Sequence, residues 1–352
     1  MKKIALVLAV AISSFSVMAQ NVAKNELRQL QAFLAQPAQE ATTNAEALKI
    51  TDTKNVASWE GVTVSDGHVT AIDWKGKKLA GTLDLSGFSA LTTLDVSRNH
   101  LSVLDLANDA ALTEVNASRN RLTELSIAGC KQIVKLTLNN NRLPDITIDA
   151  APYIKNINIA SNYLVSLDVS NSSTLETLNC QSNHLENLNV ANCTNLKNLY
   201  CGYNKLSSFT IAGLTSLKNL NVDDNNLSNM IVSKLPSLAF FVCSDNNMQT
   251  LGVRECPALL DLVCSYNNLT DLSVSDCPQL QFVDCSYNDL TSLTLSNQTF
   301  LQRLICNNNQ LNMLDVSFDE NLTYINCRYN TITDLRTQAC PNLSMVACQW
   351  NY

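Results

Sequence analysis

The sequence has few of the residues on which catalysis and nucleic-acid binding usually depend. Its 352 residues include only three histidines, His68, His100 and His184, and none belongs to a Ser/His/Asp or metal-ligand arrangement. A glycine-rich phosphate loop is missing. The formal net charge is −7, without the basic footprint of a nucleic-acid binder. We therefore expect neither an enzyme nor a nucleic-acid-binding protein, and we predict no catalytic residue, metal site or cofactor.

Long apolar runs are also scarce, and the one that stands out lies at the start of the chain. Lys2 and Lys3 precede the apolar run 4–12, which is too short to span a bilayer. Small and apolar residues then lead to Ala19, as a signal peptidase site requires. We expect residues 1–19 to be a signal peptide. We expect no transmembrane segment in the mature chain, which would be periplasmic, at the cell surface or secreted.

From Leu91 onwards the sequence repeats every 21 residues without slippage. Twelve complete units span residues 91–342, a partial unit covers 343–352, and a looser unit, 69–90, precedes them. Apolar positions 4 and 6 with a variable residue between them predict a short strand with one buried face. Apolar positions 11, 14 and 16 predict a return segment that also faces inward. A single unit cannot bury this surface alone, whereas stacked units would share one continuous core.

The ninth position of the repeat is always asparagine. These residues are Asn99, Asn120, Asn141, Asn162, Asn183, Asn204, Asn225, Asn246, Asn267, Asn288, Asn309, Asn330 and Asn351. An amide side chain carries two donors and an acceptor, so in the turn after each strand it can pair with backbone groups that would otherwise be buried without partners.

The complete repeat reads L-x-x-L-x-C-x-x-N-x-L-x-x-L-x-V-S-x-x-x-x, and residues 259–269 show it most clearly. This motif resembles that of the leucine-rich-repeat family, over about three-quarters of the chain. The resemblance implies an α/β repeat fold: a curved, right-handed solenoid with a parallel sheet of short strands on its concave face.

The thirteen cysteines occupy only two columns of the repeat. Position 6 holds Cys180, Cys201, Cys243, Cys264, Cys285, Cys306, Cys327 and Cys348, and position 19 holds Cys130, Cys193, Cys256, Cys277 and Cys340. In other units position 6 is aliphatic, which is typical of a packing site. Strands about 4.8 Å apart hold parallel side chains farther apart than a disulfide prefers. We predict a ladder of buried thiols; a metal site would need convergent ligands, and a redox site an exposed thiolate.

A 21-residue repeat with cysteine stacked at one inward position resembles the cysteine-ladder internalins, which are surface adhesins of bacteria. This resemblance implies adhesion or the recognition of another protein. We therefore expect an exported protein that binds a protein or peptide partner through its concave face.

Each end of a solenoid needs a cap, because the core is exposed there. Residues 20–68 are expected to cap the start, with a helix over 25–36 that places Leu27, Leu30, Phe33 and Leu34 on one side. The segment from Trp59 onwards is similar to the N-terminal cap of plant-type leucine-rich-repeat proteins, but Val64 replaces a cysteine of that cap, so its disulfide is not expected. At the other end the last repeat stops at Tyr352. Either the chain is a fragment or something covers this end, and an end-to-end homodimer is one explanation.

Repeat positions 3, 5, 7 and 8, with position 10 at the rim, are expected to line the concave surface. The early units place basic residues there, interpreted as a solvated face: Arg98, Arg119, Arg121, Lys135 and Arg142. From the sixth unit onwards aromatic and acidic residues follow. The predicted partner-binding residues are Tyr203, Phe240, Tyr266, Phe282, Tyr287, Tyr324, Tyr329, Trp350, Asp224, Asp245, Asp261 and Asp284.

Aromatic side chains at solvent-facing positions are typical of binding surfaces, and acidic neighbours favour a cationic partner segment. Two alternatives remain open. Tyrosine and tryptophan on an open face can stack on sugar rings, which would make the protein a glycan binder. Cross-strand stacking of the aromatic rings can also serve only to stabilise the sheet.

Overall fold

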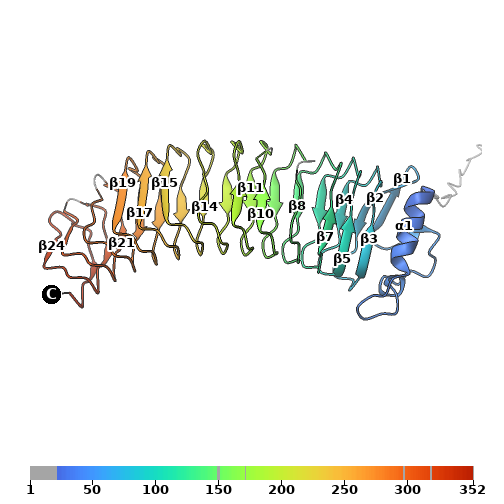
Figure 1. Ribbon diagram of the computed structural model, residues 1–352, viewed down its shortest axis with the longest axis horizontal. Helices are drawn as coiled ribbons and strands as arrows, with labels where there is room; N and C mark the ends of the chain where they lie inside the picture. Colours follow the sequence, from blue (N-terminus) through green and yellow to red (C-terminus); the bar gives the residue numbers. More distant parts are fainter. Residues whose placement is uncertain (1–21, 149–150, 171, 296–297, 318, 352) are drawn as a thin grey trace, which may run out of the picture.

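The protein is a solenoid of stacked turns that is bent into a shallow arch (Figure 1). The structure is a computed structural model that describes residues 22–148, 151–170, 172–295, 298–317 and 319–351. The predicted signal peptide, residues 1–19, lies outside the described residues, as does Tyr352.

The main sheet runs along the whole solenoid and contains fifteen strands within the described residues. In spatial order they are β1 (Val62–Ser65), β2 (His68–Asp73), β4 (Thr93–Asp95), β6 (Glu114–Asn116), β8 (Lys135–Thr137), β9 (Asn156–Asn158), β11 (Thr177–Asn179), β13 (Asn198–Tyr200), β14 (Asn219–Asn221), β16 (Phe240–Val242), β18 (Asp261–Val263), β20 (Phe282–Asp284), β21 (Arg303–Ile305), β23 (Tyr324–Asn326) and β25 (Met345–Ala347). The strands β1 and β2 are antiparallel, and the others pair in parallel. The offset is 22 residues between β2 and β4, as Ile72 with Leu94, and 21 residues from β4 onwards, as Leu220 with Phe241. Each repeat strand occupies positions 3–5, and its central residue is buried in every strand except the terminal β25, so the predicted solenoid and its strand face are confirmed.

The return side of the coil carries shorter sheets of two or three parallel strands. They are β3 (Ala80–Asp84), β5 (His100–Asp105) and β7 (Glu124–Ser126); β10 (Ser166–Asp168) and β12 (Asn187–Asn189); β15 (Asn229–Ser233), β17 (Thr250–Arg254) and β19 (Asp271–Ser275); and β22 (Met313–Asp315) and β24 (Asp334–Arg336). Buried side chains at positions 14 and 16, such as Leu251 and Val253, face the core from this side. The repeats therefore close with strands and turns, and the core is a single column between two sets of strands.

In the part of the chain that the structure describes, helix occurs only before the repeats. The helices are α1 (Lys24–Leu34), α2 (Asn44–Ala47) and the 3-10 turn η1 (Val56–Ser58). The predicted helix is confirmed, with Leu30, Phe33 and Leu34 buried and Leu27 partly buried. Among the described residues, no helix is long and apolar enough to cross a membrane.

The N-terminal segment covers the open edge of the return sheet at β3 (Figure 1). Gln36 pairs with both backbone groups of Thr82, since its Oε1 accepts from the Thr82 N–H and its Nε2 donates to the Thr82 carbonyl, both at 2.8 Å. The fully buried Asn44 donates to the carbonyl of Ala80 at 2.9 Å and accepts from its N–H at 3.1 Å. Backbone groups on the open edge of β3 gain hydrogen-bond partners in this way. The domain boundaries at residues 68 and 69 remain predictions.

The asparagine at position 9 ties each turn to the turn before it. Asn225 is typical: its Nδ2 donates to the carbonyls of Val222 in its own turn and Cys201 in the preceding turn, both at 3.1 Å. Its Oδ1 accepts from the N–H of Leu206 at 2.9 Å. Asn225 is buried, so these backbone groups have no access to water. The predicted role of the asparagine is confirmed.

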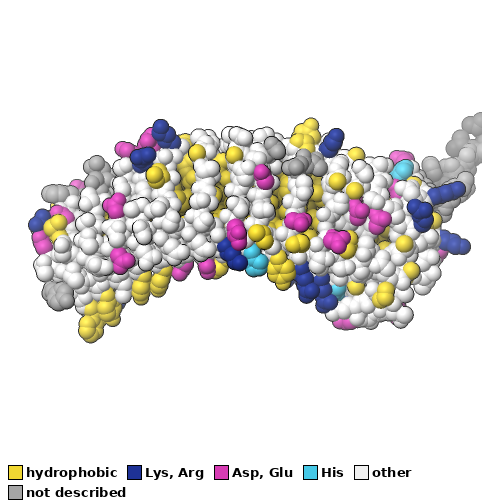
Figure 2. Space-filling model, in the orientation of Figure 1, with side chains coloured by type: hydrophobic (Ala, Val, Ile, Leu, Met, Phe, Trp, Pro, Cys, Tyr) yellow, Lys and Arg dark blue, Asp and Glu magenta, His cyan; other side chains and the backbone are white. Residues whose placement is uncertain are grey.

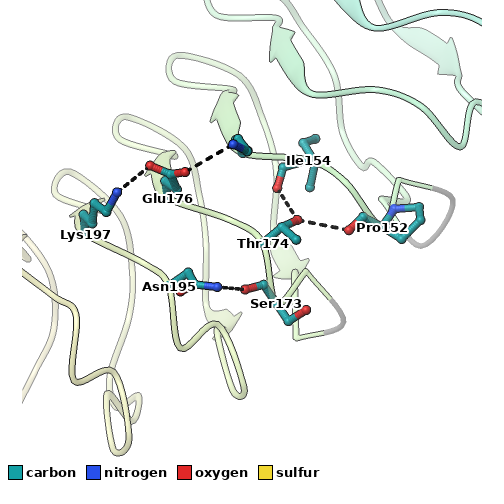
Figure 3. A network of polar contacts seen from close by, with 8 residues as sticks. Pro152, Ile154, Ser173, Thr174, Glu176, Asn195 and Lys197 are labelled. Carbon is teal, nitrogen blue, oxygen red and sulfur yellow. Dashed lines mark hydrogen bonds and ion pairs between the residues drawn. The ribbon is translucent and has the colours of Figure 1, made fainter.

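Polar side chains on the surface add further links between turns (Figure 3). The Thr174 hydroxyl donates to the carbonyls of Pro152 at 3.0 Å and Ile154 at 2.9 Å. Glu176 forms an ion pair with Lys197 one repeat later, at 2.7 Å. Because these groups are partly exposed to water, each contributes little, and the buried ladder of asparagines provides the specificity of stacking.

Most of the cysteines are packed in the core, as predicted. Eleven of the thirteen are buried, whereas Cys340 is half-buried and Cys348 is exposed in the terminal partial unit. Burial raises the pKa of the Cys180 thiol to about 12 and that of Cys327 to about 11, so the thiolate is disfavoured. At position 19 the Cys277 thiol lowers the pKa of Cys256, but that side chain has no exposed surface.

Asp109 is a buried carboxyl group at repeat position 19, the position that holds five of the cysteines. Its Oδ1 accepts from the N–H of Phe88 at 2.8 Å, while its Oδ2 is buried without a hydrogen-bond partner among the described residues. Burial raises the pKa of Asp109 to about 8, so the protonated, neutral form is the one that the folded state favours.

Replacing Asn225 with leucine should lower the free energy of unfolding by roughly 3 kcal/mol, because several backbone groups lose their partner in the core. Chemical denaturation followed by circular dichroism measures this. The control is Asn226→Leu at the exposed neighbouring position, which should change stability little. Equal effects of the two substitutions would contradict the role of the ladder.

Titration of the native protein with a thiol reagent should label Cys348 rapidly and the eleven buried cysteines only on unfolding. The variant Cys348→Ser should remove the rapid phase, and denaturant should restore labelling of the rest. Rapid labelling of many thiols in the native state would be incompatible with a packed ladder.

The free energy of unfolding should fall as the pH rises from about 4 towards about 8. In the folded state Asp109 keeps its proton up to about pH 8, whereas the unfolded chain releases it near pH 3.8, so unfolding in this range releases a proton. The stabilisation that comes from this proton is complete at acidic pH and is lost as the pH rises through the folded-state pKa of about 8. Denaturation midpoints across this range should fall less steeply in the isosteric variant Asp109→Asn, which keeps the acceptor for Phe88; Asp319, whose pKa burial raises to about 6, accounts for part of the remaining slope. An identical pH profile in both proteins would show that Asp109 does not titrate as proposed.

Candidate functional site: two rows of side chains on the C-terminal half

Repeat position 8 has the same unusual backbone in every turn. Its residues all have positive φ angles, between 46° and 64°: Arg98, Arg119, Asn140, Ser161, Ser182, Tyr203, Asp224, Asp245, Tyr266, Tyr287, Asn308, Tyr329 and Trp350. Left-handed backbone is uncommon for tyrosine, tryptophan and arginine. The backbone N–H is nevertheless satisfied, since that of Tyr266 donates to the Ser286 carbonyl of the next turn at 3.0 Å. The repeat thereby aligns one side chain per turn just beyond the strands.

We call the last eight of these residues, from Tyr203 to Trp350, the rim row. Its aromatic members are exposed: Tyr203 by 54%, Tyr266 by 51%, Tyr287 by 43%, Tyr329 by 50% and Trp350 by 70%. Tyr266 and Tyr287 stack with ring centroids 4.3 Å apart, and Tyr329 stacks on Trp350 at 5.8 Å. Hydrophobic side chains project from the lower edge of the arch towards its C-terminal end (Figure 2).

A second row lies on the open face of the main sheet, at repeat position 3. This face row comprises Phe240, Asp261, Phe282, Arg303, Tyr324 and Met345, which are neighbours through the register of the strands. Phe240 and Met345 are exposed by 44% and 55%. Phe282 and Tyr324 are half-buried, since Arg303 lies between their rings, 5.3 Å from the centroid of Phe282 and 5.6 Å from that of Tyr324.

Acidic side chains occupy the part of the two rows nearest to the middle of the chain. Asp224 and Asp245 are exposed between Tyr203 and Tyr266 in the rim row. Asp261 is half-buried in the face row, and burial raises the pKa of its carboxyl group. Within the described residues these carboxylates form no ion pair, and together with the exposed rings they give this stretch a negative, partly apolar character.

Asp223, next to the rim row at position 7, has a confined carboxyl group. Burial raises the pKa of Asp223, and its Oδ1 is buried without a hydrogen-bond partner among the described residues. The carboxyl group lies over Gly202 of the preceding turn, where an added Cβ atom would clash with it. Glycine at this position therefore makes room for the acidic side chain.

Asp284 differs from the other predicted binding residues. Its Oδ1 accepts from the N–H of Ser286 at 3.0 Å and from the Ser286 hydroxyl at 2.6 Å. This is the turn-forming contact that Asp and Asn at position 5 make elsewhere, as Asp95 does with Ser97. Part of the carboxylate of Asp284 thus serves the turn after its strand.

Eleven of the twelve predicted residues therefore fall in the two rows, and Asp284 lies between the rows at position 5. Sequence reasoning missed three members: Arg303, Met345 and Asn308. The repeat register places all three in these columns, but they are neither aromatic nor acidic, and those were the residue types taken to indicate a binding surface. It also missed the stack of Tyr163 on His184 at position 10, with centroids 5.8 Å apart.

The N-terminal end of the same sheet has a different surface. A hollow of about 450 Å³ lies over β2, β4, β6 and β8, lined in part by Asp95, Glu114 and Lys135. None of the predicted partner-binding residues lines it. The described residues hold no group of three or more His, Cys, Asp or Glu that could bind a metal ion.

Comparison with solved structures shows the same architecture in bacterial proteins. The functional domain of InlJ from Listeria monocytogenes, which includes a cysteine ladder, matches with 26% identity and a TM-score of 0.57 over 77% of this chain. The chain spans about half, 54%, of the length of that structure. YopM, a leucine-rich effector protein from Yersinia pestis, matches over 77% of this chain and 83% of its own, with 23% identity and a TM-score of 0.57.

InlF, an internalin from Listeria monocytogenes, covers 94% of this chain and 98% of its own, with 18% identity and a TM-score of 0.50. No protein-family model and no curated protein matches the sequence. The structural matches show that the chain has the leucine-rich-repeat fold and that its cysteine ladder has a counterpart in InlJ.

Proposed function

We propose that this leucine-rich-repeat solenoid is an exported protein that binds a protein or peptide partner through the concave side of its C-terminal half. The observation that carries the proposal is the exposure of aromatic rings in two aligned rows over successive turns. Water-exposed apolar surface of this extent is rare on a protein without partners. Aromatic side chains are also the ones most often found at the energetic centre of protein interfaces.

Ring stacking alone is a weaker explanation of the two rows. The contacts between Tyr266 and Tyr287 and between Tyr329 and Trp350 do stabilise neighbouring turns. Yet these residues remain exposed by between 43% and 70%, and Tyr203 and Phe240 lie outside any stacked pair among the described residues. Stacking also restricts the rings before binding, which lowers the entropy that a complex must lose.

The start of the sequence and the similar structures support the same proposal. The basic start and short apolar run within residues 1–19 favour export. InlF is an internalin of Listeria monocytogenes, InlJ comes from the same bacterium, and YopM is an effector protein. An adhesion or recognition role outside the cytoplasm agrees with these similarities.

A glycan-binding role is the second candidate, and one feature of the sheet favours it. Amide and hydroxyl groups form a line on the open face, where Asn219 donates to Asn198 at 2.6 Å and Asn198 donates to Thr177 at 3.1 Å. Such groups, with Tyr200 and Tyr203 nearby in sequence, suit a sugar. A glycan array probed with the mature chain separates the two candidates.

The double variant Tyr266→Ala, Tyr287→Ala should weaken partner binding at least about tenfold, because two interface aromatics are removed together. Proteins or peptides retained by immobilised mature wild-type chain and by the variant are quantified side by side. A denaturation curve of the variant reports the loss of the stack separately.

The matched control is Tyr153→Ala, since Tyr153 is exposed to a similar extent, 53%, but lies outside both rows. This control should retain the partner as wild type does. Reduced stability of the double variant with undiminished binding would favour the stacking explanation over the proposed interface.

A further inference from the structure

Arg303 is the residue of the face row whose chemistry the proposed function does not yet use. It opens strand β21 and is exposed on the open face of the main sheet. The rings of Phe282 and Tyr324 lie on its two sides, at 5.3 and 5.6 Å from the guanidinium carbon. Two neighbouring strands thereby hold a long, flexible side chain at one place on the surface.

The guanidinium has no counter-ion within the described residues. Other cations of the solenoid differ in this respect: Arg336 pairs with Asp334 at 2.7 Å, and Lys197 pairs with Glu176 at 2.7 Å. For Arg303 the described part of the chain shows neither an ion pair nor a side-chain hydrogen bond. Contacts with ring faces use none of the five N–H donors of the guanidinium, so these remain free to bind a ligand.

We propose that Arg303 anchors a carboxylate group of the polypeptide partner. This inference rests on the proposed function and specifies the chemistry of its ligand. A planar guanidinium fork matches a carboxylate with two parallel hydrogen bonds, which a point charge such as lysine does not provide. Because the two rings already restrict Arg303, little side-chain entropy remains to be lost on binding.

The neighbourhood of Arg303 limits where the partner's negative charge can lie. Asp284 is on the adjacent strand, and Asp261 is two strands away in the same row, about 10 Å from the spacing of strands. Like charges would repel an acidic group placed over these residues. The partner therefore presents its carboxylate locally over Arg303, and neutral or cationic groups towards β18.

Selection from a random peptide display library on the immobilised mature chain tests the proposal while the partner is unidentified. Peptides enriched by wild type should share an aspartate or glutamate at one fixed place relative to an apolar consensus. Selection on Arg303→Gln should keep the apolar consensus and lose the acidic preference. Selection on Arg336→Gln, a matched exposed arginine on the return side, should resemble that on wild type.

The strongest enriched peptide is then synthesised with its acidic residue intact, replaced by glutamine, or replaced by phosphoserine. Wild type should bind the acidic form about tenfold more tightly than the glutamine form, and Arg303→Gln should bind both equally. Arg303→Lys should recover only part of the difference. Tighter binding of the phosphoserine form than of the acidic form would overturn the assignment to a carboxylate.

The outcomes also separate this inference from the proposed function. Enrichment of apolar peptides without an acidic preference, lost in the variant Tyr266→Ala, Tyr287→Ala, would leave the binding surface standing and overturn the role of Arg303. Failure to enrich any peptide would overturn both. A denaturation curve of Arg303→Gln close to that of wild type excludes unfolding as the reason for an altered selection.

Discussion

The hydrogen bonds of the position-9 asparagine set the geometry on which the rest of the solenoid depends. Each amide satisfies backbone groups of its own turn and of the preceding turn, as Asn225 does with Val222, Cys201 and Leu206. An insertion or deletion of one residue within a turn would displace one of these partners and leave a buried group unsatisfied. This constraint explains why the repeat holds its length without slippage from Leu91 onwards, and why the main-sheet strands from β4 to β25 share one register.

A fixed backbone separates the scaffold from the surface. The turn requires left-handed backbone at position 8, whatever the residue, at a cost of roughly 1–2 kcal/mol for a side chain other than glycine. The ladder beside it outweighs that strain. Once the path of the chain is set in this way, position 8 can change from arginine in the first two turns to acidic and aromatic residues in late ones without altering the fold. The aligned rows therefore follow from the repeat, and their chemistry from the individual residues.

The sequence was a sufficient guide wherever a property follows from periodicity. The strand at positions 3–5, the buried asparagine and the packed cysteines all recur with the repeat, so one unit predicts the others. The return strands were less evident, since they are short and pair only in groups. The position of Arg303 between Phe282 and Tyr324 depends on side-chain conformation across three strands, which the residue types alone do not determine. The turn contact of Asp284 with Ser286 likewise needs the local backbone path.

The column of buried thiols has a consequence for how the chain matures. Only the thiolate reacts with oxidants and disulfides, and burial keeps the thiols of the ladder protonated. In an unfolded chain under oxidising conditions the same cysteines would be accessible to oxidants, and mismatched cross-links would prevent the turns from stacking. Stacking of the turns and oxidation of the thiols thus compete while the chain folds. Rapid folding of successive turns protects the ladder, because each new turn buries the sulfur atoms of the turn before it.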